Sequence, residues 1–580
     1  MTAVAPRPTG RTRGRRTTAS LTTGAEAVPE ALRRRARDIG RLADTTWDVL
    51  IVGGGIVGMG ALLDAVSRGL RAAVIEQDDV AAGTSSRSSR LIHGGVRYLE
   101  QLHLPLVREA LAERRRLLRN APHLVTLQPL LFPIFGLPFI HKPFYDAGLT
   151  LYDILGARHD GGWHRRLSTA ETLDIAPDLR KRDLRGGLLY HDGMEDDARL
   201  TLGVARTALA SDLEPVAVTR VKALGLGDDV DESPSVRARV LRAQDLMSGS
   251  AFDIRARSVV DATGVWAADR EHPFASAALR ILPSRGAHLV VPRSRVPAST
   301  GLALRVPGKV VFFVPWPDFW LIGTTDAPYN GRTVRPGAGG WEVDQLLATT
   351  NHFFDIDLRR DDVVGTYAGL RPLIAPSGGS TVKASREHRV TVDGNRVVRI
   401  GGGKYTTYRV MAKDVIDGAL GATEARRRPS DTEDRRIIGA ADRPALDQIA
   451  AELAARPEIA AAHPEAARRL VARHGTEATA VAALGGELDL LRPLVAGRPF
   501  LEAEVAWGVR HELALTVDDI LSRRLRLSPE LGDGSVAAAA ALRVAEIMGH
   551  ELAWSDDRRR QEAATYLEGA ALEYAVPPPA

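Results

Sequence analysis

Short apolar runs and a helical repeat alternate from Trp47 onward. Asp48–Val52 has the composition of a buried strand, Ile56–Arg68 has the spacing of a helix, and Ala72–Ile75 is a second strand that ends at Glu76. A strand, a helix and a strand in this order predict a βαβ unit with parallel strands. We therefore expect an α/β domain to begin near residue 47.

The pattern changes twice further along the chain. Residues 186–330 alternate strand-like runs with turns, as in FDIRARSVVDATG, HLVVP, KVVFFVP and FWLIGTTD, and predict a mixed sheet layered on the first domain. Residues 443–575 are rich in Ala, Leu, Glu and Arg with helical periodicity, which predicts a separate helical domain. We expect a basic, disordered tail over 1–46, a main body over 47–430 and a helical domain over 431–580.

Residues 127–155 are apolar and aromatic, with four prolines among them. Because Pro129, Pro133, Pro138 and Pro143 interrupt the segment, it cannot form one membrane-spanning helix. Two interpretations stay open: a loop that covers the core followed by one helix, or a patch that dips into a bilayer surface. The pattern alone does not separate them.

Charge and cysteine content narrow the class of protein. The 580 residues have a net charge of +5, with 44% hydrophobic and 26% charged residues, as in an ordinary globular protein. Residues 1–46 hold ten arginines and four acids, so the rest of the chain is close to neutral. Because there is no cysteine, disulfides, cysteine-ligated zinc, iron–sulfur clusters and thiol catalysis are excluded. The arginine-rich start lacks the apolar run of an export signal, and we expect a cytoplasmic protein.

The strongest local motif is Gly53-x-Gly55-x-x-Gly58, which follows the first strand and opens the helix. The glycines allow a tight turn and a close backbone approach, so that the helix N-terminus can face a pyrophosphate. Glu76 lies 23 residues after Gly53, where it can accept hydrogen bonds from the hydroxyls of an adenosine ribose. This context predicts a dinucleotide site but does not separate FAD from NAD.

Two further elements favour FAD. Ala262 and Gly264 end the strand-like run SVVDATG, and their small size lets the backbone pass close beside a dinucleotide. Gly402, Gly403 and Thr406 belong to a glycine-rich turn before a helix, which can stabilise negative charge on a reduced flavin. Together with the first motif, these elements spread over about 350 residues, which fits a large flavoprotein better than a compact NAD domain.

The segment GTSSRSSRLIHGGVRYLE combines hydroxyls, an imidazole and glycines. Thr84, Ser85 and Ser86 can bind the phosphate oxygens of a dinucleotide, or they can form a helix cap and turn. His93 and Gly94 place an imidazole beside a flexible backbone. We interpret Thr84, Ser85, Ser86, His93 and Gly94 as cofactor contacts, and the phosphate and cap roles of the three hydroxyls can hold together.

Several cations lie in contexts that suit an anionic substrate. Arg97 and Tyr98 form a candidate phosphate clamp, with a surface salt bridge and a packed ring as the alternative. Arg371 lies among apolar neighbours in YAGLRPL, and a buried arginine needs an anionic partner. Arg386 lies in ASRE. Lys404 lies in the glycine-rich turn of a chain with only seven lysines, so it is less readily explained as a generic surface charge.

Six segments, in this order, resemble the FAD-dependent glycerol-3-phosphate dehydrogenases of aerobic respiration: DVLIVGGGIVGMG, GTSSRSSRLIHGGVRYLE, DDARL, IGTTD, YAGLRPL and GGGKYTTYR. This resemblance covers roughly residues 47–410, and residues 509–527 are similar to the helical C-terminal domain of that family. It implies an α/β FAD-binding fold of the glutathione-reductase type on the amino-acid-oxidase branch. A mixed-sheet substrate domain and a C-terminal helical domain complete this fold. The implied cofactor is FAD, without a metal.

The resemblance also implies the reaction and the residues that carry it. The substrate is sn-glycerol 3-phosphate, the product is dihydroxyacetone phosphate, and electrons pass to a membrane quinone. By residue-wise match, the family's substrate pocket falls on Arg97, Tyr98, His288, Thr324, Arg371, Arg386 and Lys404. The FAD site falls on Gly53, Gly55, Gly58, Glu76, Thr84, Ser85, Ser86, His93, Gly94, Ala262, Gly264, Gly402, Gly403 and Thr406.

Oxidation removes a hydride from C2 while a proton leaves the C2 hydroxyl, so a base must lie within hydrogen-bond reach. We nominate His288, because a neutral imidazole accepts a proton near pH 7, with His93 as the second candidate. Without the resemblance, His288 reads as a strand-end histidine bound to backbone and Thr324 as part of a turn. Arg371 would polarise the developing carbonyl oxygen.

Other readings of acceptor, partner and location stay open. The oxidase variant of the same scaffold would reduce O2 to peroxide, whereas the apolar segment 127–155 favours a membrane quinone. The family implies peripheral association with the inner face of the plasma membrane. An RNA-binding flavoprotein would use the arginine-rich tail, but the body lacks a basic stripe with interleaved aromatics, so we expect no nucleic-acid partner. A homodimer is one candidate for the oligomeric state.

Two features depart from the family. The basic extension lies outside the matched region, and no function is carried onto it. Glu195, just before DDARL, stands where related members have an aromatic residue. If its carboxylate faced the substrate pocket, it would conflict with the binding of a phosphate.

Overall fold

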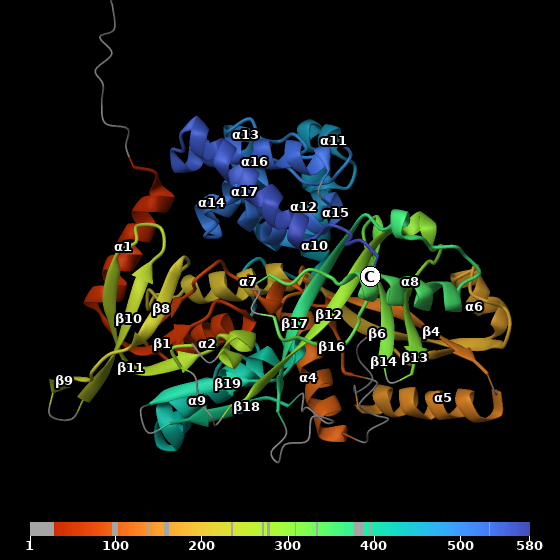
Figure 1. Ribbon diagram of the computed structural model, residues 1–580, viewed down its shortest axis with the longest axis horizontal. Coiled ribbons are helices and arrows are strands. Elements are labelled where there is room, and N and C mark those ends of the chain that lie inside the picture. Colours follow the sequence, from red (N-terminus) through yellow and green to blue (C-terminus); the bar gives the residue numbers. More distant parts are fainter. Residues whose placement is uncertain are drawn as a thin grey trace, which may run out of the picture.

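Two sheets with their covering helices form the body of the molecule, and a group of helices lies against one side of it (Figure 1). The structure is a computed structural model. It describes residues 28–95, 103–136, 138–155, 162–233, 236–269, 272–274, 279–307, 309–331, 335–375, 387–393, 396–532 and 534–579.

The helices fall into two groups, those of the body and those of the C-terminal part. Those of the body are α1 Glu30–Asp44, α2 Ile56–Ser67, α4 Leu104–Asn120, α5 Pro138–Leu155, α6 Thr169–Ile175, α7 Asp197–Leu209, α8 Gly340–Phe353 and α9 Tyr408–Arg427. Those of the C-terminal part are α10 Arg443–Ala454, α11 Pro457–Ala462, α12 Ala466–His474, α13 Ala478–Glu487, α14 Ala503–His511, α15 Ser528–Leu531, α16 Ser535–Leu552 and α17 Asp556–Glu573. Short turns are η1 Thr84–Ser86, η2 Gly264–Ala268, η3 Arg293–Arg295, η4 Arg360–Asp362, η5 Tyr405–Thr407, η6 Gly475–Glu477 and the π-helical η7 Asp519–Arg524.

The strands make a nine-stranded and a ten-stranded sheet. The first contains β1 Thr46–Val52, β2 Ala72–Ile75, β7 Val216–Val218, β8 Val221–Leu226, β9 Val230–Ser233, β10 Val236–Asp245, β11 Ala251–Asp261, β18 Arg389–Val392 and β19 Val397–Gly401. The second contains β3 Leu91–Ile92, β4 Val125–Phe135, β5 Arg165–Leu167, β6 Leu184–Glu195, β12 Ile281–Pro292, β13 Gly301–Val306, β14 Lys309–Trp316, β15 Phe319–Gly323, β16 Ala327–Pro328 and β17 Gly365–Ile374.

The first sheet is built around the predicted βαβ unit. Strand β1 pairs in parallel with β2 and with β11, and β11 pairs in parallel with β19. All four residues of β2 and the last four of β1 are buried, because parallel strands are covered on both faces. The carboxyl ends of these strands therefore meet at one edge, where ligands bind in open α/β sheets.

The second sheet is mixed and contains three of the predicted runs, HLVVP, KVVFFVP and FWLIGTTD. The prediction is wrong for FDIRARSVVDATG, because this run forms β11 of the first sheet, where it pairs in parallel with β1. Its long antiparallel pair β12–β17 places His288 opposite Tyr367 and Ser284 opposite Arg371. Strand β12 also pairs with β15, where His288 lies opposite Gly323. The β13–β4 contact is parallel and short. This register brings two of the predicted substrate residues onto neighbouring strands.

Residues 127–155 form a strand and a helix rather than a loop and a helix. Strand β4 holds Pro129 and Pro133, which a strand tolerates where one edge is not continuously hydrogen-bonded. Along that edge β4 meets β13 only at Leu130 and Leu131. Helix α5 is the single helix that the pattern predicts. Within the part of the chain that the structure describes, no helix is long and apolar enough to cross a bilayer.

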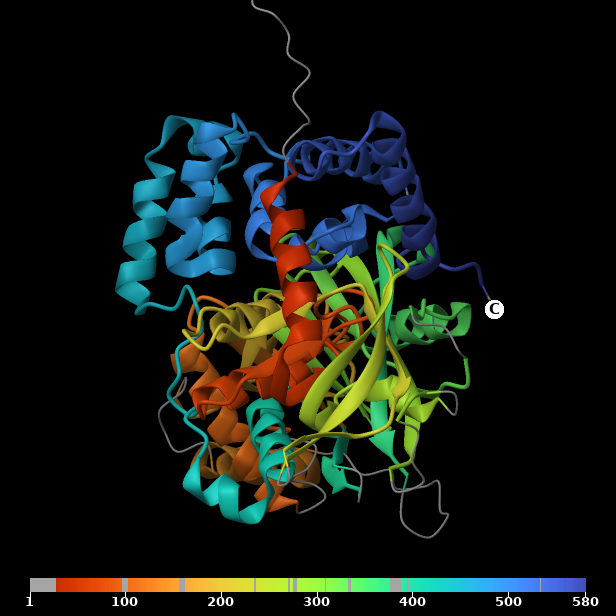
Figure 2. The same cartoon turned by 90° about the vertical axis from the view of Figure 1, so that its left-hand side faces the viewer.

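Part of the predicted tail is a docked helix. Helix α1 buries Leu42 completely beside Trp47, and the Nη2 atom of Arg35 lies 2.7 Å from a carboxylate oxygen of Asp245. Figure 2 shows α1 running from the body toward the C-terminal helices, where Arg34 donates to the carbonyl oxygen of Arg510. The tail prediction is therefore wrong for residues 30–44, because frequent arginines hide an amphipathic spacing. Residues 1–27 lie outside the described residues.

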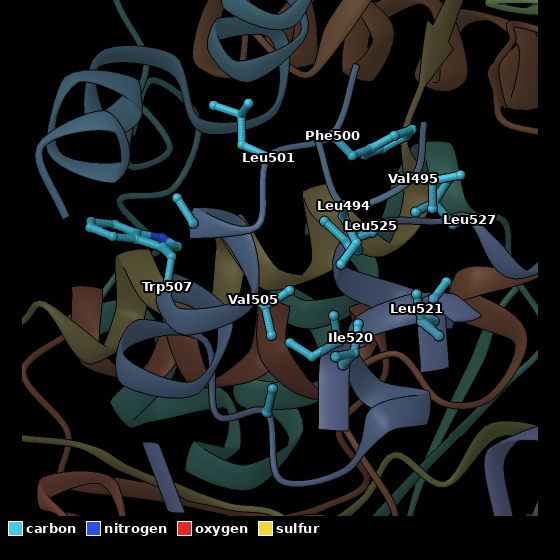
Figure 3. Packing of buried hydrophobic residues seen from close by; sticks show 14 of the residues in the cluster. Leu494, Val495, Phe500, Leu501, Val505, Trp507, Ile520, Leu521, Leu525 and Leu527 are labelled. Atoms are coloured by element: carbon cyan, nitrogen blue, oxygen red, sulfur yellow. The ribbon is translucent and has the colours of Figure 1, made fainter. Parts of the chain in front are cut away.

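The C-terminal helices share an apolar core that continues into the second sheet (Figure 3). Residues such as Leu494, Phe500, Ile520 and Leu525 are at most 7% exposed. The same cluster includes Tyr367 of β17, which is 2% exposed. The helical domain is thus packed on the sheet that carries the substrate residues.

Candidate active site

A cavity of about 680 Å³ lies where the two sheets meet. Its wall includes the turn between β1 and α2, the segment after β2, the strands β12 and β17, and the turn before α9. This volume is in the usual range for ligand pockets. The three regions that the sequence singled out for a cofactor therefore line one space.

The turn between β1 and α2 leaves no room for side chains. Gly53 has φ +113°, and a Cβ on it would lie 2.6 Å from the carbonyl oxygen of Ala262. A Cβ on Gly58 would overlap the carbonyl oxygen of Gly53. The glycines therefore permit the tight turn, and Gly53 and Gly55 line the cavity, where the backbone can approach a pyrophosphate.

Glu76 lies at the end of β2 and lines the cavity. Its carboxylate accepts hydrogen bonds from the backbone N–H of Gly54 at 2.6 Å and of Asp78 at 2.7 Å. Burial raises the pKa of Glu76 to about 7. Because each carboxylate oxygen has two lone pairs, Glu76 can still accept a hydroxyl of a ribose.

The hydroxyl groups of η1 form hydrogen bonds with the protein's own backbone. Thr84 donates to the carbonyl oxygen of Leu370 at 2.6 Å, and Ser85 accepts the N–H of Ile56 at 2.9 Å, at the start of α2. Ser86 donates to the carbonyl oxygen of Gly83 at 3.4 Å. These contacts are those of the predicted helix cap and turn. Thr84 and Ser85 also line the cavity, where a cofactor phosphate would lie.

The predicted cofactor residues divide into those that line the cavity and those that do not. The cavity is lined by Gly53, Gly55, Glu76, Thr84, Ser85, His93, Ala262, Gly264, Gly402, Gly403 and Thr406. It is not lined by Gly58, Ser86 or Gly94. The N–H of Gly94 donates to the hydroxyl of Tyr152 at 2.8 Å, and a Cβ there would strike Leu111 only 2.5 Å away, so Gly94 serves packing.

His288 lies on β12, lines the cavity and is 3% exposed. Its Nε2 atom is 2.8 Å from Ser89 Oγ, and its ring stacks on Tyr367 with centroids 4.5 Å apart and planes 7° apart. Burial, together with the positive charges of Arg371 and Arg90, lowers the pKa of His288 to about 3. The imidazole is therefore neutral near pH 7.

Arg371 lies beside His288 on the neighbouring strand. One of its terminal nitrogens donates to Thr324 Oγ1 at 3.1 Å and to the carbonyl oxygen of Thr325 at 3.2 Å. The other lies 3.3 Å from Asp326. Thr324 and Lys404 line the same cavity. The fold thus brings His288, Thr324, Arg371 and Lys404 together, although they come from four separate segments.

The cavity residues that the sequence analysis did not single out include Ser89, Lys309 and Asp326. Lys309 is one of only seven lysines in the chain, so the scarcity argument used for Lys404 applied to it equally. Burial lowers the pKa of Lys309, which lies at the start of β14. Ser89 stands within the segment SSRSSR, but no local signal in the sequence points to its contact with His288.

The other predicted positions are three that the structure does not describe and Glu195. Arg97, Tyr98 and Arg386 lie outside the described residues. Glu195 is 2% exposed and does not line the cavity, so its carboxyl group does not face the substrate end. Burial, together with the charges of Asp197 and Asp196, raises the pKa of Glu195 well above its usual value.

Known proteins match the chain along most of its length. Residues 48–412 match the family of FAD dependent oxidoreductases, and residues 430–559 match the C-terminal domain of alpha-glycerophosphate oxidase. A glycerol-3-phosphate dehydrogenase of Mycobacterium leprae is 40% identical over 94% of this chain and 92% of its own length. The chain belongs to the FAD-dependent glycerol-3-phosphate dehydrogenase family.

Other members of the glycerol-3-phosphate dehydrogenase family agree with this assignment. The human mitochondrial enzyme is 35% identical over 90% of this chain and 72% of its own length. The structure of the Bacillus halodurans glycerol-3-phosphate dehydrogenase, complexed with FAD, has a TM-score of 0.74 and 27% identity. It covers 93% of this chain and 98% of its own. The predicted FAD-binding fold and the predicted cofactor, FAD, are confirmed.

Proposed function

We propose that this FAD-dependent oxidoreductase oxidises sn-glycerol 3-phosphate to dihydroxyacetone phosphate. The observation that carries the proposal is the meeting of His288, Arg371 and Lys404 in the cavity that the glycine-rich turn also lines. The names of the relatives from M. leprae and human mitochondria support the choice of substrate.

The first end of the cavity suits FAD. Gly53 and Gly58 leave the turn before α2 free of side chains, and Glu76 is available for the ribose. Gly402 and Gly403 line the cavity beside the turn that opens α9, where the positive end of the helix favours negative charge. When bound, FAD supplies the group that takes up a hydride from C2 of the substrate.

The second end of the cavity suits a phosphate group. Arg371, Lys404 and Lys309 line the cavity, and a guanidinium can bind a phosphate through two parallel hydrogen bonds. We assign Arg97, Tyr98 and Arg386 to the same role from the resemblance. Thr324 and Thr325 hold the guanidinium of Arg371, so that it can orient a substrate oxygen and stabilise charge as C2 becomes a carbonyl carbon.

His288 is the proposed base. In the tautomer that serves as a base, Nδ1 carries the proton and Nε2 accepts, first from Ser89 Oγ and then from the C2 hydroxyl. The pKa of His288, about 3 without a ligand, rises when a phosphate dianion opposes the field of Arg371. His93 is the second candidate. It also lines the cavity, and its ring centroid lies 6.3 Å from that of Phe312.

We further propose a membrane quinone as the electron acceptor and peripheral attachment to the inner face of the plasma membrane. Phe132 of β4 lines the cavity, and β4 leads directly into the apolar helix α5. Phe312 and Tyr190 belong to the same apolar cluster as Phe132 and also line the cavity. The three rings give an aromatic wall against which a quinone ring can pack.

The acceptor is tested with substrate-reduced enzyme given either air or a ubiquinone or menaquinone analogue under nitrogen. We expect flavin to be reoxidised faster by a quinone analogue than by oxygen, with little peroxide. Dominant peroxide formation would instead support the oxidase alternative, to which the match of residues 430–559 also points. Flotation with vesicles of anionic phospholipid tests attachment separately.

A further inference from the structure

Arg526 of the C-terminal part reaches back to the segment that contacts His288. It follows the π-helix η7, is 3% exposed and has φ +66°, a left-handed conformation that a residue with a side chain adopts at an energetic cost. Such a backbone persists where the surrounding contacts require it.

The guanidinium of Arg526 fixes two backbone groups of the segment Ser86–Ser89. Its Nη2 atom donates to the carbonyl oxygen of Ser86 at 2.8 Å and to Asp197 Oδ1 at 2.9 Å. The other oxygen of Asp197, which is fully buried, accepts the N–H of Ser88 at 2.9 Å. One buried ion pair between the C-terminal part and α7 thus holds the segment at both sides of Arg87.

The same segment holds the imidazole of His288 on two sides. The carbonyl oxygen of Ser88 accepts the hydroxyl of Tyr367 at 3.0 Å, and the Tyr367 ring stacks on the His288 ring. Ser89 Oγ lies 2.8 Å from His288 Nε2. A shift of this segment therefore moves both the hydrogen-bond partner and the stacking partner of the imidazole.

We propose that Arg526 is a positioning residue for the oxidation, acting on His288 through the segment Ser86–Ser89. The proposal rests on the proposed function, in which His288 Nε2 receives the proton of the substrate hydroxyl. It gives the helical C-terminal domain a part in the reaction, although Arg526 does not line the cavity. The ion pair joins the segment DDARL, which holds Asp197, to the run RRLR, which ends at Arg526.

Lysine cannot replace Arg526 in this arrangement. An ammonium is a single point donor on a flexible stem, whereas the guanidinium presents a rigid, planar set of donors. Glutamine removes the charge and leaves Asp197 buried without its cation. Arg526→Lys is therefore the milder and Arg526→Gln the more severe variant.

Arg199 offers a matched control. It is 4% exposed, belongs to α7, and pairs with both oxygens of Glu512 in the C-terminal part at 2.7 Å. Arg199→Gln thus breaks a second buried ion pair between the same two parts of the molecule. None of the contacts of Arg199 reaches the segment Ser86–Ser89.

The test compares these variants as FAD-loaded enzymes, with sn-glycerol 3-phosphate as substrate and rates expressed per bound FAD. We expect Arg526→Gln to lower kcat about tenfold or more, because small misplacements of a reacting group are costly, while KM changes less than about threefold. Arg526→Lys should lose less of kcat and keep its FAD. Arg199→Gln should keep kcat per bound FAD within about twofold of wild type.

A crystal structure of each variant gives a second readout that needs no turnover. In Arg526→Gln we expect the contact of Ser89 with His288 and the stacking on Tyr367 to be broken, and in Arg199→Gln to be kept. Unchanged His288 contacts or kcat in both Arg526 variants, or an equal loss of kcat in Arg199→Gln, would overturn the proposal. If wild type does not oxidise sn-glycerol 3-phosphate, the proposed function fails, and the crystal structures still decide the positioning claim.

Discussion

At the scale of single residues, the proposed substrate binding depends on a few cations that line the cavity. The apolar context of Arg371 and the scarcity of lysine pointed to Arg371 and Lys404, and the resemblance to the family was needed to assign them to the substrate. The contact between Ser89 and His288 could not be selected in this way, because it joins residues 199 positions apart and depends on the pairing of β12 with β17.

Arg371→Ala and Lys404→Ala test the substrate end. Truncating a buried charged partner of a ligand costs about 2–5 kcal/mol, so we expect kcat/KM to fall roughly 30-fold or more while FAD stays bound. Steady-state kinetics with the FAD content of each preparation measures this. Arg182→Ala is the control, because the Arg182 side chain is 88% exposed. Near wild-type kcat/KM in both variants would refute the assignment.

Gly58→Ala tests the cofactor turn. The new methyl group would overlap the carbonyl oxygen of Gly53, so the turn must move and we expect the protein to lose FAD. The ratio of flavin to protein absorbance reports this loss. Gly225→Ala serves as the control, since a Cβ there meets nothing within 4 Å. A fully loaded, yellow Gly58→Ala protein would contradict the reading of the motif.

At the scale of helices and strands, periodicity predicted the elements that are regular and buried. The first βαβ unit appears within a few residues of where the pattern placed it. The strands of residues 186–330 were also predicted, but they divide between the two sheets, because strand pairing depends on contacts far apart in the sequence. The predictions for two elements were wrong, each for a physical reason. Helix α1 hides its apolar face among arginines, and β4 contains prolines that only its short pairing with β13 permits.

Leu42→Ala tests whether α1 is part of the folded body. The side chain of Leu42 is fully buried beside Trp47, so we expect the free energy of unfolding to fall by about 2–5 kcal/mol. Urea unfolding measures the change. Val28→Ala, at a position that is 56% exposed, should change it by less than about 0.5 kcal/mol. Equal effects of the two substitutions would show that α1 is not docked.

At the scale of the whole molecule, the helical domain is bound to the body by buried ion pairs as well as by an apolar core. Arg524 Nη2 lies 2.8 Å from Asp79, three residues after Glu76, and Arg87 pairs with Glu573 at the same distance. Neither contact could be predicted from the sequence, because each joins residues more than 400 positions apart.

Buried histidines give the molecule a pH-dependent stability. Burial lowers the pKa of both His123 and His288 to about 3, against 6.5 for an exposed histidine. Between these values the unfolded chain binds more protons than the folded one, so stability is complete above pH 6.5 and is lost as the pH falls. Each histidine adds a slope of up to about 1.4 kcal/mol per pH unit.

His123→Gln should therefore flatten the dependence of the unfolding free energy on pH between 6.5 and 5, relative to wild type. Urea unfolding at several pH values measures both slopes, and the difference isolates this histidine from the other titrating groups. Identical slopes would show that His123 titrates in the folded protein as it does in water.

The central claim is that sn-glycerol 3-phosphate delivers its C2 hydride to the bound FAD. Anaerobic mixing of the purified flavoprotein with this compound, followed by the visible flavin absorbance, tests the cofactor, the reaction class and the substrate together. We predict rapid bleaching at a rate no slower than turnover, with no bleaching by glycerol or by amino acids. A flavin that stays yellow with sn-glycerol 3-phosphate, or that is bleached by an amino acid instead, would contradict the account.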